Sequence, residues 1–229
     1  MGVRTAQQLL DRAREIMGDV GATRWENPEA LNAINDGQRE TVVALPSSNV
    51  RTQLLTLAAG TRQDLVAIGA ADAVQFMRYL NNFTGTTPGR AVVTRPMGWI
   101  DSERPNWHTD TAGPAQLCMH DPSEPLVFYV WPPADGTTHR GRISHSALPA
   151  DLPSLATALV LPDVYFNAQL YYLCFRMSAK QTSFARNSLG TYFYDLFLNA
   201  LGIKDAKGRE RDPNLQMAAN GSGVTGGPP

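Results

Sequence analysis

The sequence predicts an α+β protein: a four-helix bundle formed by the N- and C-terminal helix pairs, with a β-rich insertion between them and a flexible C-terminal tail. Residues 1–46 and 158–203 repeat apolar side chains at helical spacing. Residues 47–157 are rich in Pro, Gly and Thr and contain short apolar runs typical of hairpins and long loops. Residues 204–229 lose this periodicity. We therefore expect a helical bundle, an inserted β domain and a C-terminal docking tail.

The first helix has clear start and stop signals. Thr5 and Gln8 fit a capping box, and Gly18 follows the last apolar position. The apolar face between them consists of Leu9, Leu10, Ala13, Ile16 and Met17. This pattern predicts a short amphipathic helix.

The second helix is predicted in "NPEALNAINDGQRETVVAL", with Asn27 as its cap, Pro28 at its first position and Pro46 after its end. Gly37 lies in its interior, where glycine costs about 1 kcal/mol relative to alanine. A glycine retained at such a position indicates a close crossing with another helix.

The third helix, in "LPDVYFNAQLYYLCFRMSAK", is apolar around most of its circumference. At 100° per residue its polar side chains Gln169, Arg176 and Lys180 form one narrow stripe. Such a helix is expected at the centre of a bundle, or shared between its own core and a neighbouring subunit. We expect Arg176 to pair with a carboxylate or to cap carbonyl groups at a helix interface.

A fourth helix is predicted in "SFARNSLGTYFYDLFLNALGIK", with Gly202 as its stop. Together the helices provide a set of residues expected in the bundle core or in packing between subunits. These are Gly37, Leu170, Leu173, Cys174, Arg176, Met177, Tyr192, Phe193 and Leu196.

Between the helix pairs, "TQLLTLAAGTRQDLV" predicts two strands joined by an Ala-Gly turn. "LVFYVWPP" and "RGRISHSALP" predict two further strands. Residues 72–83 fit a helix or a strand, and we favour a short helix.

Composition excludes several classes of protein. The chain is 43% hydrophobic and 18% charged, which is ordinary for a folded protein. Twenty basic and twenty-one acidic residues give a net charge of -1, so a DNA-reading role is not expected. No segment has the apolar length of a membrane span, and no start signal for secretion is recognised. Cys118 and Cys174 are expected to remain unpaired in a reducing compartment.

The best enzyme alternative is an Fe(II)-dependent oxygenase. His108 and Asp110 form an H-x-D pair, and His139 or His145 would supply the third ligand of a facial triad. The other interpretation is a loop anchored by Trp107, in which Trp99 and Trp131 serve as further anchors. We favour the loop, and expect no catalytic residue, no metal and no cofactor.

The order of several stretches resembles the head-to-tail adaptor (head completion, tail tubular protein A-like) proteins of tailed bacteriophages. These stretches are "LNAINDGQRETVVALP", "LAAGTRQDL", "RAVVTRPMGWIDSERPNWH" with "MHDPSEPLVFYVWPP", and "LPDVYFNAQLYYLCFRMSAK" with "YFYDLFLNAL". The resemblance implies a structural virion protein that forms a ring below the portal and lets DNA pass as transient cargo.

The resemblance also implies partners and a location. A portal protein, a tail or nozzle protein and further copies of the same chain, twelve if it matches a portal, are the implied partners, with no membrane. The implied location is the head–tail junction of the virion, after assembly in the host cytoplasm. We expect the tail to dock to the portal or a neighbouring subunit through Lys207, Arg209, Arg211, Leu215 and Met217. A helical scaffold that binds a host protein is a third interpretation.

Overall fold

The computed structural model describes residues 3–179 and 187–210 of the chain. The chain forms two compact units. The helical unit combines Met1–Leu45 with Asp151–Pro229, and the β unit is Pro46–Ala150. Each unit has its own apolar core and is described separately below.

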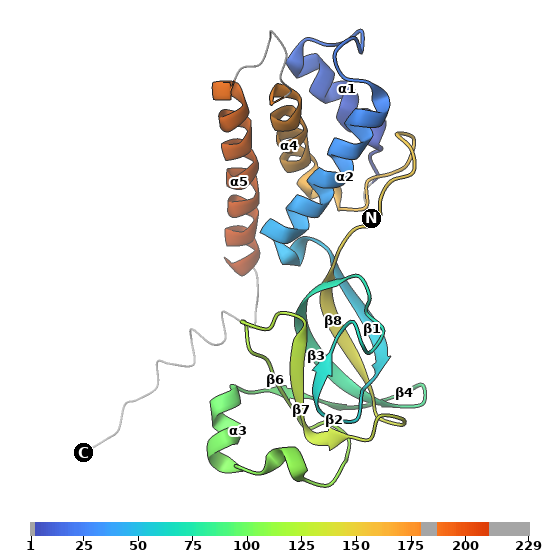
Figure 1. The fold of residues 1–229 in the computed structure, drawn as a ribbon, viewed down its shortest axis with the longest axis vertical. Helices are drawn as coiled ribbons and strands as arrows, with labels where there is room; N and C mark the ends of the chain where they lie inside the picture. The colour runs from blue at the N-terminus through green and yellow to red at the C-terminus, as the bar shows by residue number, and fades with distance from the viewer. Residues whose placement is uncertain (1–2, 180–186, 211–229) are drawn as a thin grey trace, which may run out of the picture. The chain divides into compact units, whose positions relative to one another are not determined.

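The helical unit is organised around one central helix (Figure 1). Its described residues form the helices α1 (Ala6–Met17), α2 (Asn27–Ala44), α4 (Phe166–Ser178) and α5 (Asn187–Glu210). α4 packs against each of the other three. Its residues Leu170, Leu173, Cys174 and Met177 are buried among side chains of α1, α2 and α5. The nearly uniform apolar character of α4 is therefore explained within a single chain.

The start of α1 is confirmed, whereas that of α2 is not. The amide of Gln8 donates to Thr5 Oγ1 (3.3 Å), the amide of Thr5 donates to Gln8 Oε1 (3.1 Å), and Gly18 ends α1 with φ at 68°. Glu26 takes the cap position of α2 and makes no side-chain capping bond. Asn27 is the first helical residue, and its Oδ1 accepts a hydrogen bond from Arg14 (2.9 Å).

Gly37 lies where α2 crosses α4. A β-carbon at this position would lie 2.8 Å from Tyr172 Cδ1 on α4, closer than real contacts allow. Glycine thus lets the two backbones approach, and Tyr172 covers the gap.

The predicted stop at Gly202 is wrong, because α5 continues to Glu210. A single glycine costs a helix about 1 kcal/mol, which is too little to end one by itself.

The β unit contains two four-stranded sheets (Figure 1). One sheet has the order β1-β8-β3-β4 and the other the order β2-β7-β6-β5. Their bounds are β1 Val50–Thr56, β2 Gly60–Asp64, β3 Ala73–Thr84, β4 Thr87–Ala91, β5 Val93–Thr94, β6 Leu117–Met119, β7 Val127–Ala134 and β8 Arg140–Ala147. All pairs are antiparallel except β5 with β6. A short helix, α3 (Met97–Glu103), was not predicted.

The predicted fold class is wrong in its main feature, the four-helix bundle framed by terminal helix pairs. The described residues form five α-helices and two four-stranded sheets, and the strands build a core of their own. That core includes Phe76, Tyr79, Phe128 and Ile143, with the Phe76 and Phe128 rings stacked at 4.6 Å. In the helical unit, three helices surround α4 instead of forming two matched pairs.

Two local predictions in the β unit are also wrong. Of the stretch 72–83, residues 73–83 fall in strand β3 instead of a helix. The stretch "TQLLTLAAGTRQDLV" contains two strands, but β1 pairs with β8 and β2 pairs with β7, so they form no hairpin. The strand predictions for "LVFYVWPP" and "RGRISHSALP" are confirmed as β7 and β8.

Candidate docking surfaces

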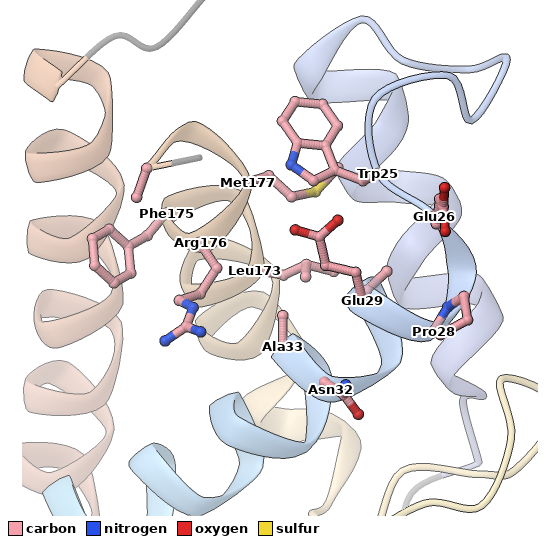
Figure 2. A pocket seen from close by; sticks show the side chains of 12 residues that line it. Trp25, Glu26, Pro28, Glu29, Asn32, Ala33, Leu173, Phe175, Arg176 and Met177 are labelled. Carbon is pink, nitrogen blue, oxygen red and sulfur yellow. The ribbon is translucent and has the colours of Figure 1, made fainter. Parts of the chain in front are cut away.

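A groove of about 760 Å³ lies between the first half of α2 and the end of α4 in the helical unit. Trp25, Leu173 and Met177 provide apolar walls. Figure 2 shows the Glu29 side chain reaching from α2 into the hollow toward α4. Glu26 lies near the start of α2, and Arg176 lies on the α4 side. A groove that combines apolar walls with charged side chains can receive a polypeptide segment.

Trp25 is held in the groove wall through both of its backbone groups. Its amide donates to Asp19 Oδ2 (3.3 Å), and its carbonyl accepts from Arg14 Nη2 (2.8 Å). Asp19 also accepts from the amides of Thr23 (3.0 Å) and Arg24 (3.2 Å). The loop between α1 and α2 is therefore organised around one buried carboxylate.

The environment of Asp19 shifts its pKa. Burial alone would raise the pKa of this carboxyl, but the hydrogen bonds from Thr23, Arg24 and Trp25 outweigh burial and lower it. A lowered folded-state pKa means that the ionised carboxylate stabilises the folded state. This contribution is present above the ordinary value of 3.8 and is lost as the pH falls through the lower folded-state pKa.

We predict that Asp19→Asn lowers the free energy of unfolding by about 2 kcal/mol at neutral pH, because charged hydrogen bonds to backbone amides are replaced by weaker ones. The difference in the free energy of unfolding between the variant and the unchanged protein should shrink steadily below about pH 4, because the Asp19 carboxyl then takes up a proton. Urea unfolding at neutral and acidic pH measures both effects. Asn in place of exposed Asp195 on α5 is the control. A pH-independent loss in the Asp19 variant would contradict this account.

Arg176 belongs to a line of ion pairs beside the groove. Its guanidinium lies 3.4 Å from Asp36 Oδ2, Asp36 lies 3.5 Å from Arg39, and Arg39 donates to Asp151 Oδ2 (2.7 Å). The Arg176 side chain is 46% exposed, so its pair with Asp36 contributes little to stability. Arg176 does pair with a carboxylate, but in contact with solvent.

The other predicted packing residues divide into two groups. Phe193 is buried and Leu196 is partly buried against the same core as α4. Tyr192, in contrast, is 56% exposed on α5.

Cys118 and Cys174 are free and buried, and burial raises the pKa of the Cys174 thiol to about 12.

The three tryptophans predicted as loop anchors have different environments. Trp107 is buried and donates to Asp101 Oδ1 (3.0 Å), with Ile100 and Met119 in the same apolar cluster. Trp131 is half-buried, and Trp99 is 43% exposed.

The residues of the Fe(II) alternative are not brought together as one ligand set. His108 Nδ1 shares a hydrogen bond with Thr61 (2.8 Å), and Asp110 accepts from Trp131 Nε1 (2.7 Å). His139 belongs to the turn at Asp135, and His145 is buried beside Asp72. Within residues 3–179 and 187–210, no three His, Cys, Asp or Glu side chains are placed to hold a metal ion.

A comparison with protein families decides what kind of protein carries these surfaces. The family model described as SU10 adaptor protein matches residues 4–221, which is most of the chain. The chain belongs to this family. The resemblance to phage head-to-tail adaptors is thereby confirmed, and the protein is a structural adaptor of a bacteriophage virion. No curated protein matches the chain.

Membership in this family implies that the adaptor interacts, in general, with the portal and tail proteins of the phage. Within the described ranges, no helix of the adaptor is long and apolar enough to cross a membrane.

The predicted docking residues of the adaptor lie at or beyond the end of the described chain. Lys207 and Arg209 fall within the helical range of α5, beyond the last described side chain. Arg211, Leu215 and Met217 lie outside the described residues.

The groove of the adaptor was not predicted from the sequence. Its signal is present in "DVGATRWENPEA", where Asp19 precedes the backbone amides that it binds and Trp25 precedes the helix start. An acidic side chain ahead of a short loop, followed by an aromatic residue at a helix entry, is a pattern that could have indicated it.

Proposed function

We propose that this adaptor forms a ring below the portal, joins the capsid to the tail and lets DNA pass through its centre. The observation that carries the proposal is the family match over residues 4–221. A net charge of -1 is compatible with a conduit, because a strongly basic lumen would retain DNA. The ring would contain twelve copies if it matches a portal, and would assemble in the host cytoplasm before joining the virion.

Contacts between copies need exposed apolar surface, and α5 provides some. Tyr192 and Leu198 are exposed on this helix, although most of its other large apolar side chains are buried or partly buried. We assign Tyr192 to packing between subunits and the α4 residues to the core of each copy. The groove between α2 and α4 is a second surface available to a neighbouring copy.

The experiment that tests the proposed function removes the adaptor gene from the phage that encodes it. Filled heads and separate tails should accumulate, and supplying the adaptor should restore joined particles. Image reconstruction of those particles should place a ring of adaptor copies between portal and tail. Normal tailed particles made without the adaptor would overturn the proposal.

A further inference from the structure

Strand β1 is an open edge of its sheet. It pairs with β8 from Val50↔Ser146 to Thr56↔Arg140 without a register shift, and none of the described strands lies on its other side. Two backbone hydrogen bonds at the ends of the strand show which of its residues bond to β8. Ala147 donates to the Asn49 carbonyl (3.0 Å), and Leu57 donates to the His139 carbonyl (2.9 Å).

Because antiparallel strands alternate in the direction of their backbone groups, the odd-numbered residues of β1 bond to β8. The amides and carbonyls of Val50, Thr52, Leu54 and Thr56 therefore point away from the sheet. Among the described residues, no backbone or side-chain group bonds to them. The edge is also accessible, since Val50 is 45% exposed and Thr52 and Thr56 are exposed as well.

The other three sheet edges carry protective features that β1 lacks. β4 contains Pro88 and Gly89, β2 has a register shift between Gly60 and Arg62, and β5 is only two residues long. Natural proteins shield edges with prolines, bulges and short strands, since an open edge templates pairing with another chain. A regular seven-residue edge without such features is suited to receive a strand.

The charge of this sheet indicates which strand would fit. Its four strands contain five arginines and no Asp or Glu. Arg51 on β1 is paired with Asp72, whereas Arg142 on the adjacent strand β8 is exposed and has no carboxylate partner in the described part of the chain. Arg78 and Arg90, farther along the sheet on β3 and β4, are exposed in the same way. A second copy is a poorer match for β1, because its own sheet would offer arginines and no Asp or Glu from the strands. The other sheet edges of that copy also carry the protective features named above.

We propose that β1 is a β-augmentation site that takes up an extended, acidic segment of a different virion protein, added as a strand beside Val50–Thr56. This rests on the proposed function, because the partner is met in the assembled particle. Backbone hydrogen bonds would provide the affinity, and the arginines of the sheet would favour carboxylates on the incoming segment.

Thr52 allows a matched test of the backbone contact. Proline at an edge is tolerated where its missing N–H faces outward, so Thr52→Pro removes a bond to the partner but none to β8. Thr52→Val is the control, since both variants lose the hydroxyl bond between Thr52 and Ser144 (2.7 Å) and only proline loses the amide. We expect Thr52→Val to enter particles normally and Thr52→Pro to enter about tenfold less. Equal incorporation of the two variants would overturn the proposal.

Hydrogen exchange of the unchanged adaptor provides a test that does not depend on how the proline variant folds. The amides of Thr52, Leu54 and Thr56 should exchange quickly in the free protein and about a hundredfold more slowly in purified particles. An adaptor that is present in particles with these amides still exchanging quickly would overturn the edge site and leave the proposed function standing. An adaptor absent from particles would instead overturn the proposed function.

Two charged substitutions at Thr52 test whether the partner segment is acidic. Thr52→Glu should reduce incorporation about tenfold, whereas Thr52→Lys should enter particles at least as well as Thr52→Val. Equal loss of incorporation in the Glu and Lys variants would exclude an acidic partner segment. Loss in the Lys variant alone would indicate a basic partner segment.

Discussion

Replacing Gly141 by alanine is expected to destabilise the β unit by about 3 kcal/mol, at the upper end of what overpacking costs in a core. A β-carbon on Gly141 would lie 2.3 Å from both Cζ and the hydroxyl oxygen of Tyr79. The Tyr79 ring cannot turn aside easily, because it is fully buried and its hydroxyl donates to Asn82 Oδ1 (2.8 Å). Asn82 is itself fixed by donating to the Ala115 carbonyl (2.5 Å).

Hydrogen exchange of the amides in residues 46–150 measures the loss of stability of the β unit separately from the stability of the helical unit. Gly98→Ala on α3 is the matched control, since apart from the neighbouring residues and backbone of its own helix no described atom lies within 4 Å of the added methyl group, and the change should be neutral or slightly stabilising. If the contact with Tyr79 is the cause, Gly141→Ala should cost much less in a Tyr79→Leu background. The same cost in both backgrounds would exclude the steric explanation.

Helix ends in the adaptor are predictable where a local side chain satisfies the backbone. Thr5 with Gln8 and the left-handed Gly18 act within a few residues, so the sequence alone specifies them. Asn27 is a good capping residue by type, yet tertiary structure uses its side chain elsewhere, as the acceptor for Arg14. Gly202 likewise fits a stop signal, but the helix continues through it.

The identity of β3 could not be derived from periodicity because the strand is irregular. Phe76, Tyr79 and Phe83 are buried at spacings of three and four residues, which is the pattern of a helix. Register shifts between Phe76 and Arg78 and between Tyr79 and Asn81 each insert an extra residue. These bulges change the period of two into an apparent helical one.

Pairing between strands depends on contacts far apart in the sequence. β1 and β2 are separated by a short turn that suggests a hairpin, yet they join different sheets. Their partners, β8 and β7, lie many residues later, so no local signal distinguishes the two arrangements. The candidate surfaces follow the same rule, because Glu29 and Met177 share a groove only after α2 has packed against α4.

Deletion of residues 211–229 is expected to leave the folded units intact and to abolish attachment of the adaptor to portal-bearing capsids. α5 continues to Glu210, so the cut is placed after that residue. We propose that this segment docks to the portal or to a neighbouring subunit, because its apolar side chains Leu215 and Met217 could fill shallow pockets on a partner. Cosedimentation with capsids measures attachment, and circular dichroism and thermal unfolding check the fold.

A paired substitution separates docking by these two anchors from a general need for the segment. Leu215→Ala with Met217→Ala should weaken attachment about a hundredfold, because each truncation removes on the order of 1.5 kcal/mol of burial at an interface. Asn214→Ala with Gln216→Ala changes the alternate positions of the same stretch and should attach normally, since these polar side chains bury little apolar surface. Normal attachment of the deleted protein would assign docking to the described surfaces, the α2–α4 groove and the β1 edge. Equal losses from the two pairs would instead assign it to the backbone of the segment rather than to its apolar side chains.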